Sequence, residues 1–567
     1  MEINAKDINP TYLKTLDREA LKDLCAMLRL DLIERVTATG GHIGSNLGLV
    51  EATVALHYVF DSPIDKFVFD VSHQSYVHKM LTGRYDAFMA GTTSGYTNPS
   101  ESAHDAFMVG HTSTAVSLAV GLAKGRELMG GTERIVAVLG DGSLSGGEAY
   151  EGLDNAALVK GNLIILFNDN EMSIAENRGG IYAGLARLRE TKGQGELNLF
   201  RALGLDYVYV EDGNDLDALV DAFNTVKDYD HPVVVHIHTQ KGKGLAWAEQ
   251  YKERGHWISP ASWTAPKEPS LPVQIADYLE KKMAARQDIV VVNAATPGAA
   301  GLLPEWRQRV GDRFVDVGIC EEHAAAYASG IAKRGAKPVW LVLSSFVQRT
   351  YDQLMQDVAL NGNPAVVLVY NGGFGKSDPT HAGLYDMSMM SNIPGLLCLA
   401  PTTKEQLFAA LDWALEERET PVVIRVPNAL PDFPAPKTFN GWQIWHKGKD
   451  VAILALGDMA QTAPNVCDFL RQNGLNPTLV ACDCYSEVDA SALDALIPEH
   501  RLFVTLESGI LSGGFGQKVA AYLADKDAKV LLRGADKAFV DRKTTLEQLA
   551  ACRMTPEAIL EDIRKHI

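Results

Sequence analysis

The sequence lacks the features of a membrane protein or a nucleic-acid binder. No apolar run approaches the roughly 20 residues needed to cross a bilayer. The segment MEINAKDINP has no basic stretch followed by an apolar core, so we expect a cytoplasmic protein without a secretory leader. Lys and Arg number 53 against 71 Asp and Glu. Because phosphate backbones are bound by clustered basic residues, we expect neither nucleic acid nor membrane as a partner.

Cysteine is scarce as well, with seven in 567 residues and no C-x-x-C spacing. Such an odd, scattered set predicts reduced thiols rather than a disulfide framework. Cys482 and Cys484 stand close together in LVACDCYS. Two small buried thiols in a strand are the more usual explanation of that pattern, and a metal site is the alternative. Low-complexity tracts are also missing, which predicts a chain that is folded throughout.

Apolar β-branched runs alternate with helical patterns along the chain. The runs include IVAVLG, LIILFN, VVVHIH, VWLVL, VVLVY, VVIRV, VAILAL and LFVTL. This alternation predicts an α/β fold with mostly parallel sheets. A single core stops growing near ~250–300 residues, and the Pro-rich segments WISPASWTAPKEPSLP and VPNALPDFPAPKTF are candidate boundaries. We therefore predict three stacked domains, at 1–270, 271–434 and 435–567.

Polar groups follow two neighbouring strands of the first predicted domain. Gly140-Asp141-Gly142 ends one strand, and Asn168-Asp169-Asn170 ends the next, so Asp141 and Asn170 are 29 positions apart (170 − 141). One strand–helix–strand crossover of that length returns the chain beside its start. Mg²⁺ prefers oxygen ligands and phosphates, and glycines let backbone amides approach a phosphate. The combination predicts a magnesium and diphosphate site, whereas Gly-Asp-Gly alone would indicate only a turn.

Histidines and acids occupy further predicted loops and helix starts. His42, His73 and His111 lie in GHIGSNLG, DVSHQSYVHK and GHTS, where imidazole can bind a diphosphate or move protons, although a single histidine is more often structural. Glu321 and Glu322 begin a predicted helix, and helix-dipole stabilisation explains such acids equally well. The positions of these residues alone therefore do not distinguish a catalytic role from a structural one.

These motifs resemble the thiamine diphosphate (ThDP) binding motif of transketolase-like enzymes, and the likeness to the 1-deoxy-D-xylulose 5-phosphate synthases covers nearly the whole chain. The resemblance implies a diphosphate-binding, a pyrimidine-binding and a C-terminal domain in that order. It implies that Glu321 activates the coenzyme by hydrogen bonding to its aminopyrimidine ring, which makes ThDP a carbon nucleophile and electron sink. It also implies a homodimer.

The resemblance assigns roles to further positions. His42, His256 and His381 are the implied catalytic partners of Glu321, although a surface loop is the plainer explanation of His256. The implied Mg²⁺ ligands are Asp141, Asn170 and the carbonyl of Met172. Arg349, Arg425 and Asp378 are the implied substrate residues. The remaining implied coenzyme contacts are His73, His111, Ser113, Gly140, Gly142, Lys241 and Phe346, the last stacking on the pyrimidine.

The chain departs from the family pattern where arginines would hold a substrate phosphate. In VYNGGFGKSDPTHAG the expected arginine falls on Tyr370 or Asn371, and the expected acid on Ser377 or Asp378. Asn428 stands in place of a second arginine. Leu343 replaces a tyrosine, and the stretch between Asn177 and Leu203 is shorter than in the family. Since arginine is the preferred phosphate fork, these changes bear on the acceptor.

Three functions follow from these observations. The first is synthase chemistry, in which pyruvate loses CO₂ and its two-carbon unit is transferred to an aldehyde, D-glyceraldehyde 3-phosphate in the family. The second is a ThDP-dependent transketolase or acyloin synthase with a different acceptor, for which an unphosphorylated aldehyde is one candidate. The third is a non-catalytic homologue that binds ligand only. In the last predicted domain, Gly513-Gly514-x-Gly516 has the look of a nucleotide loop, but a turn into a helix is the preferred interpretation.

Overall fold

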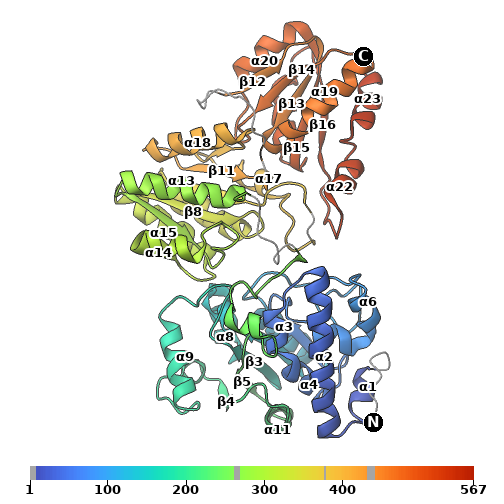
Figure 1. Ribbon diagram of the computed structural model, residues 1–567, viewed down its shortest axis with the longest axis vertical. Helices are drawn as coiled ribbons and strands as arrows, with labels where there is room; N and C mark the ends of the chain where they lie inside the picture. The colour runs from blue at the N-terminus through green and yellow to red at the C-terminus, as the bar shows by residue number, and fades with distance from the viewer. Residues whose placement is uncertain (1–7, 261–267, 376–377, 429, 431–440) are drawn as a thin grey trace. The chain divides into compact units, whose positions relative to one another are not determined.

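The structure is a computed structural model that describes residues 8–260, 268–375, 378–428, 430 and 441–567. The chain forms two compact units, one of residues 1–267 with 317–320 and one of 268–316 with 321–567. Helices and strands alternate along both (Figure 1). In the part of the chain that is described, no helix combines the length and hydrophobicity that crossing a membrane demands.

The first unit is built on a five-stranded parallel sheet of order β1-β2-β3-β5-β4. Its strands are β1 (Lys66–Phe69), β2 (Ile135–Gly140), β3 (Leu163–Asp169), β4 (Asp206–Val210) and β5 (Pro232–His238). The strands in the middle of the sheet are largely apolar, as expected where helices cover both faces. Along β2, Val136 and Val138 enter one core while Ala137 and Leu139 enter the other.

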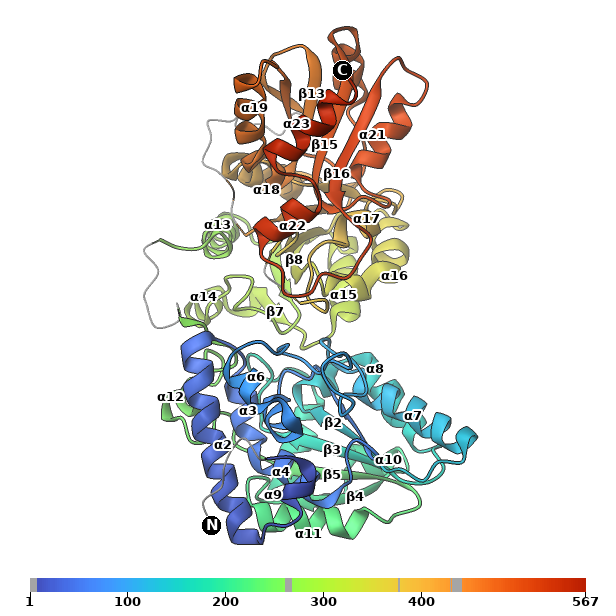
Figure 2. The same ribbon diagram turned by 90° about the vertical axis from the view of Figure 1, so that its right-hand side faces the viewer.

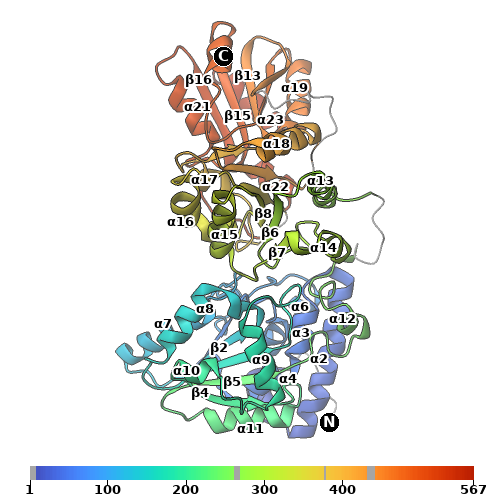
Figure 3. The same cartoon turned by 90° about the vertical axis from the view of Figure 1, so that its left-hand side faces the viewer.

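Two groups of helices supply these cores. One face is packed by α2 (Arg18–Thr39), α4 (Val50–Val59) and α11 (Leu216–Val226), and the other by α7 (Ala115–Met129), α8 (Gly147–Ala156) and α9 (Ile181–Glu190). Figures 2 and 3 show α2 and α4 on the side of the sheet opposite α7 and α8. Short helices α3 (Gly44–Gly48), α5 (Tyr76–Lys79), α10 (Leu199–Ala202) and α12 (Ala246–Gln250) join them.

The second unit contains two sheets. The six-stranded sheet is parallel throughout, in the order β10-β11-β9-β8-β6-β7. Its strands are β6 (Ile289–Asn293), β7 (Phe314–Asp316), β8 (Lys337–Leu343), β9 (Val366–Tyr370), β10 (Leu397–Leu399) and β11 (Val422–Val426). Around it lie α13 (Leu271–Ala285), α14 (Pro304–Val310), α15 (Glu321–Lys333), α17 (Asp386–Met390) and α18 (Lys404–Glu416).

The last sheet has the order β12-β14-β13-β15-β16 and is parallel except for the antiparallel edge strand β12. Its strands are β12 (Gln443–His446), β13 (Asp450–Leu456), β14 (Thr478–Cys482), β15 (His500–Ile510) and β16 (Lys529–Ala535). Helices α19 (Ala463–Gln472) and α23 (Pro556–Arg564) cover one face and α21 (Phe515–Leu523) the other (Figure 3). Helices α20 (Ala490–Leu496) and α22 (Thr545–Ala551) complete this region.

The predicted α/β class with mostly parallel sheets is confirmed. The predicted boundary at 435 lies outside the described residues, and the division into three domains stays a prediction beside the two compact units. All seven cysteines are free thiols. Among the described residues no group of three or more His, Cys, Asp or Glu side chains could hold a metal, so Cys482 and Cys484 gain no support as a metal site.

Candidate active site

The predicted metal ligands lie at the ends of adjacent strands in the first unit. Strand β2 pairs with β3 so that Gly140 lies opposite Asn168, and the Asp141 amide donates to the Asn168 carbonyl at 3.0 Å. Asp141 and Asn170 therefore follow neighbouring strands at the carboxyl edge of the sheet, where ligands of parallel sheets bind. Gly142 fits against Ser173, since a Cβ atom there would lie 2.9 Å from the Ser173 Cα.

The surroundings of these two side chains suit a bound cation. Asp141 is buried, and burial together with the nearby Asp169 raises its pKa to about 7. A buried carboxyl of this kind is stabilised in its charged form when a cation binds. The amide oxygen of Asn170 is buried and receives no hydrogen bond from any described residue. A carboxylate, an amide oxygen and a backbone carbonyl, completed by phosphate oxygens, form a set that Mg²⁺ accepts.

Two neighbours in the shortened stretch fix Asp141. Asn177 Nδ2 donates to Asp141 Oδ2 at 2.7 Å, and the Tyr182 hydroxyl donates to the Asp141 carbonyl at 3.1 Å. Neither contact is predicted from the sequence, and only the folded position of α9 brings Tyr182 to Asp141. Asp169, in contrast, is an anchor, because its carboxylate accepts from Arg189 at 2.6 Å and lies 3.2 Å from His236.

Three of the predicted histidines form one cluster. The ring centroids of His42 and His73 are 4.7 Å apart, those of His42 and His256 5.3 Å, and those of His73 and His256 5.1 Å. Residues more than 180 positions apart meet because Gly41 and Ile258 exchange backbone hydrogen bonds of 2.8 and 2.9 Å. His256 is thus buried rather than on a surface loop, the plainer alternative of the sequence analysis.

Asn46 holds the two loops of this cluster together. Its Nδ2 donates to the carbonyls of His42 and His73, both at 2.7 Å, and its Oδ1 accepts from the Tyr76 amide at 2.9 Å. The side chain is fully buried. Sequence reasoning overlooked Asn46, although a polar residue inside GHIGSNLG was the available signal.

The surroundings of His256 disfavour positive charge. Burial lowers the pKa of His256 well below its usual value, and the nearby Lys241 acts in the same direction. Burial also lowers the pKa of Lys241 to about 8, while its ammonium donates to the Ser173 carbonyl at 2.5 Å. A neutral imidazole beside a buried lysine is suited to binding an anion and accepting protons.

Ser113 and His111 lie in the loop before α7. The Ser113 hydroxyl donates to the Ser143 carbonyl at 2.8 Å, and its amide donates to Asp70 at 2.8 Å. Ser113 has a left-handed φ of 75°, and a Cβ atom on Gly146 would lie only 2.1 Å from its hydroxyl. Ser113 therefore fixes the loop that follows Asp141. His111 is half-buried two residues earlier.

In the second unit, Glu321 begins helix α15. Its side chain is buried, and burial raises its pKa to about 7 against the lowering effect of Arg349. Arg349 Nη1 lies 3.7 Å from Glu321 Oε2, which receives no hydrogen bond from the described residues. Helix-dipole stabilisation alone would not require such burial, because an exposed carboxylate serves it as well. A half-protonated acid near pH 7 is suited to proton exchange with a ligand.

Phe346 and His381 lie together in the same unit, with ring centroids 5.5 Å apart. The Nδ1 of His381 is 2.7 Å from the Thr380 hydroxyl, which donates to Asp378 at 2.5 Å. Burial alone would raise the pKa of Asp378, but hydrogen bonds from His381 and Thr380 outweigh it and lower the pKa. This places two predicted site residues, His381 and Asp378, in one hydrogen-bonded unit, while the alternative Ser377 lies outside the described residues.

The positions that depart from the family pattern have contrasting surroundings. Arg425 is buried and donates to Asp386, Ser508 and the Gly383 carbonyl. Through these bonds Arg425 stabilises the surrounding fold, and its contact with substrate stays a prediction. Tyr370 is also buried, Asn428 is exposed, and Asn371 has a left-handed φ of 58°.

The glycine-rich run in the last region starts helix α21. The Glu507 carboxylate accepts from the Phe515 amide at 2.8 Å and the Gly516 amide at 2.9 Å. It occupies the anion position that a nucleotide phosphate would need.

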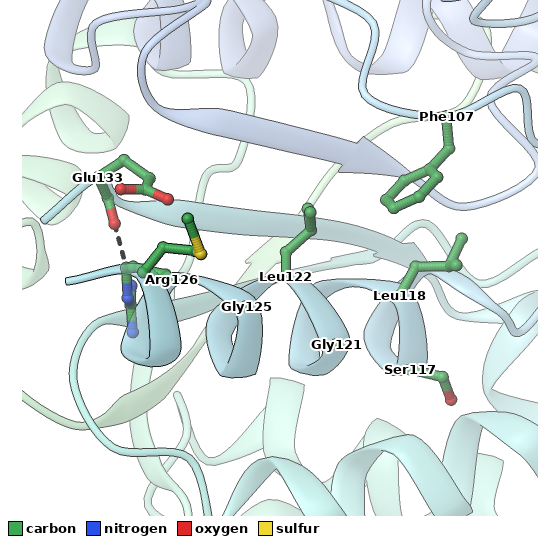
Figure 4. A pocket seen from close by; sticks show the side chains of 9 residues that line it. Phe107, Ser117, Leu118, Gly121, Leu122, Gly125, Arg126 and Glu133 are labelled. Carbon is green, nitrogen blue, oxygen red and sulfur yellow. Dashed lines mark hydrogen bonds between the residues drawn. The ribbon is translucent and has the colours of Figure 1, made fainter. Parts of the chain in front are cut away.

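Elsewhere, a depression of about 480 Å³ along α7 is lined by Phe107, Leu118, Arg126 and neighbours, and includes none of the predicted site residues (Figure 4).

Family models match almost the entire chain. The 1-deoxy-D-xylulose-5-phosphate synthase model matches residues 5–199 and 192–239, the transketolase pyrimidine-binding domain 269–432, and the transketolase C-terminal domain 441–559. The solved transketolases of Campylobacter jejuni and Leishmania mexicana cover 97% of this chain at 17% and 16% identity. The alignments span 100% and 97% of those two chains, each with a TM-score of 0.46.

Curated relatives agree with these models. The 1-deoxy-D-xylulose-5-phosphate synthase of Symbiobacterium thermophilum is 36% identical over 97% of this chain and 93% of its own length. The synthase of Shouchella clausii is 33% identical over 99% and 98%. With this identity over nearly the full length and the matching family models, the chain belongs to the 1-deoxy-D-xylulose-5-phosphate synthase family of thiamine-diphosphate-dependent transferases.

Proposed function

We propose that this protein decarboxylates pyruvate and transfers the remaining two-carbon unit to an aldehyde, D-glyceraldehyde 3-phosphate being the acceptor expected from the family. The observation that carries the proposal is the survival of Asp141, Asn170 and a buried Glu321 in a chain that matches the family end to end. A non-catalytic homologue would have no reason to keep a buried acid at Glu321, which is destabilising without a task.

Bound ThDP would supply a carbon nucleophile and an electron sink. Asp141, Asn170 and the Met172 carbonyl are the proposed Mg²⁺ ligands, and Lys241, His73, His111, Ser113 and the glycines around Asp141 the proposed surroundings of the diphosphate. Glu321 holds or releases a proton at its free oxygen because its pKa lies near 7. Phe346 would offer an apolar ring face to the pyrimidine.

Proton transfer around the substrates is assigned to three histidines. His42 and His256 belong to the cluster of the first unit, and His381 to the Thr380–Asp378 unit. A neutral imidazole can donate one hydrogen bond and accept another, and the burial of His256 favours this neutral form. Arg349, Arg425 and Asp378 are the proposed substrate contacts. We also propose a cytoplasmic homodimer, as expected for the family.

A second candidate differs only in the acceptor. The guanidinium of Arg425 is engaged by Asp386 and Ser508, and neutral side chains stand at Asn371 and Asn428. A site with fewer unengaged arginines binds a phosphate less tightly, since each charge-assisted contact contributes about 1.5–3 kcal/mol. This favours an unphosphorylated aldehyde in a transketolase or acyloin-type transfer.

One assay separates the candidates. The protein is supplied with ThDP, Mg²⁺ and pyruvate, together with D-glyceraldehyde 3-phosphate or D-glyceraldehyde, and CO₂ and products are measured. Higher kcat/KM with the phosphorylated aldehyde supports the synthase, and higher kcat/KM with the other supports the second candidate. No CO₂ from pyruvate in any mixture, together with no ThDP binding by calorimetry, would leave the ligand-binding homologue.

A further inference from the structure

Two short chain segments carry the proposed substrate residues Asp378 and His381. We call residues 371–375 and 378–385 the paired arms, because the Gly373 amide donates to the Gly383 carbonyl at 2.6 Å and the two glycines form an antiparallel bridge. The first arm follows strand β9 of the six-stranded sheet. The second leads into helix α17.

The last sheet of the chain supports the base of the paired arms. Ser508 of β15 accepts from Arg425 Nη1 at 2.7 Å and donates to Asp458 at 2.5 Å. Arg425 Nη2 in turn donates to the Gly383 carbonyl at 3.0 Å. A Cβ atom on Gly373 would lie 2.9 Å from Asp458 Oδ2 and 3.1 Å from Ser508 Oγ. The first arm therefore rests directly on this group of side chains.

The C-terminal residues also contact the paired arms farther along. Gln548 of α22 is buried, and its Nε2 donates to the Gly375 carbonyl and, at 2.9 Å, to the Lys543 carbonyl. The Ile510 amide donates to the Leu384 carbonyl at 3.0 Å. Apolar side chains close the same contact, namely Ala382 and Leu384 with Ala535, packed by Phe374, Ile510, Val540 and Cys552.

We propose that Ser508, Asp458 and Gln548 are positioning residues that hold the paired arms, and through them Asp378 and His381, in the geometry for the acceptor aldehyde. The inference rests on the proposed function. Hydrogen bonds from one rigid sheet and one helix reach both arms, and misplacement of a binding group by about 1 Å weakens catalysis strongly. The last region thereby acts on acceptor specificity without touching the acceptor.

The experiment uses the holoenzyme with ThDP and Mg²⁺ and two variants, Gln548→Ala and Ser508→Ala. Exposed residues of the same region give matched controls, Gln472→Ala and Ser491→Ala. We expect the KM for the aldehyde that the wild type prefers to rise about fivefold or more in both variants, as the loss of one hydrogen bond implies. Pyruvate-dependent CO₂ release without acceptor and the Kd for ThDP should match the controls.

Hydrogen exchange gives a readout independent of activity. Amides of the paired arms should exchange faster in both variants, while those of β2 and β3 should not change. If the wild type is active and both variants have the same KM for the acceptor aldehyde as the wild type, the positioning role is overturned. A wild type that releases no CO₂ from pyruvate would instead overturn the proposed function. If Ser508→Ala fails to fold, the positioning role is tested with Gln548→Ala alone. Gln548 lies in the short helix α22 near the end of the chain.

Discussion

Glu321 combines burial with a missing hydrogen bond, and both have measurable consequences. Its folded pKa of about 7 lies above the ordinary value of 4.5 for glutamate. The unfolded chain therefore releases this proton first as pH rises, and the folded state is destabilised progressively between about pH 4.5 and 7. This penalty is consistent with the proton exchange with the coenzyme that we propose for Glu321.

We expect Glu321→Gln to lower pyruvate turnover by about 100-fold or more, the usual effect of losing an acid–base group. Above pH 7 the free energy of unfolding of the same variant should exceed that of the wild type by about 3 kcal/mol at most, as measured by urea titration. Glu322→Gln, one residue along the same helix, is the control and should change neither quantity much. Wild-type CO₂ release by Glu321→Gln would remove this residue from the mechanism.

A second prediction for a single side chain concerns Asn46. Asn46→Ala leaves the carbonyls of His42 and His73 and the amide of Tyr76 without their bonds in a buried place. We expect a loss of about 2–4 kcal/mol in the free energy of unfolding and a lower kcat, since two proposed site histidines lose their support. Urea titration measures the first effect.

The control for Asn46 is Asn155→Ala, because Asn155 is exposed and bonds only within its own helix α8. It should change the free energy of unfolding by less than about 0.5 kcal/mol. Equal effects of the two substitutions would mean that the buried hydrogen bonds of Asn46 do not hold the histidine loops.

At the scale of elements, a buried polar network joins α4, α5 and the loop before α7. His57 Nε2 lies 2.8 Å from His78 Nδ1, and His78 Nε2 lies 2.8 Å from Asp105. Arg84 donates to the same carboxylate at 2.6 and 2.8 Å. Burial opposes the charge of Asp105, but hydrogen bonds from His78 and Arg84 lower its pKa. Burial lowers the pKa of both histidines.

This network should make the first unit sensitive to acid. The two histidines have folded pKa values below 6.5, so the unfolded chain takes up their protons first and stability falls as pH drops below about 6.5. Asp105 has a depressed folded pKa, so its contribution is present above about pH 4 and is lost below it. The raised pKa values of Asp141 and Glu321 act in the opposite direction over this range, so the test compares the wild type with His57→Phe. The wild type should lose more of its urea midpoint between pH 7.5 and 5 than this variant, and equal losses would contradict the assignment of neutral buried histidines.

Asp105→Asn should destabilise the protein by about 3–5 kcal/mol at pH 7, because the buried Arg84 loses the carboxylate at 2.6 Å and keeps only Glu101, at 3.6 Å, as a counter-charge. The exposed Asp154→Asn on α8 is the control and should be near neutral. A small effect of Asp105→Asn would show that Arg84 finds another partner.

At the scale of the whole molecule, coenzyme binding should couple to folding. ThDP with Mg²⁺ stabilises whichever part binds it by RT ln(1 + [L]/Kd), about 2.7 kcal/mol at a hundred times the Kd. We expect calorimetry to show a higher melting temperature for the first unit when both are added. Asn170→Ala should lose most of this shift while melting like the wild type without ligand.

Asn155→Ala again serves as the control, since Asn155 is exposed and is not one of the proposed site residues. It should keep the full ligand-induced shift. A full shift in Asn170→Ala would mean that Asn170 does not help to hold Mg²⁺ and the diphosphate.

The sequence by itself determined the class of fold and the chemistry of the strand ends. Apolar runs such as IVAVLG and LIILFN predict buried parallel strands because only strands covered on both faces are apolar throughout. Asp141 and Asn170 are found by their crossover spacing, which is a local property of the chain. Short or edge strands such as β1, β4 and β12 give weaker patterns and were not predicted.

Only the tertiary structure decided which distant residues meet. The bridge between Gly41 and Ile258 brings His256 to His42, the folded position of α9 brings Tyr182 to Asp141, and β15 brings Ser508 to Arg425. Long-range contacts of this kind depend on the packing of whole elements, so no local pattern encodes them. Burial has the same origin: the shifted pKa of Glu321 arises from the atoms that exclude water around it, and the sequence of its helix does not contain that information.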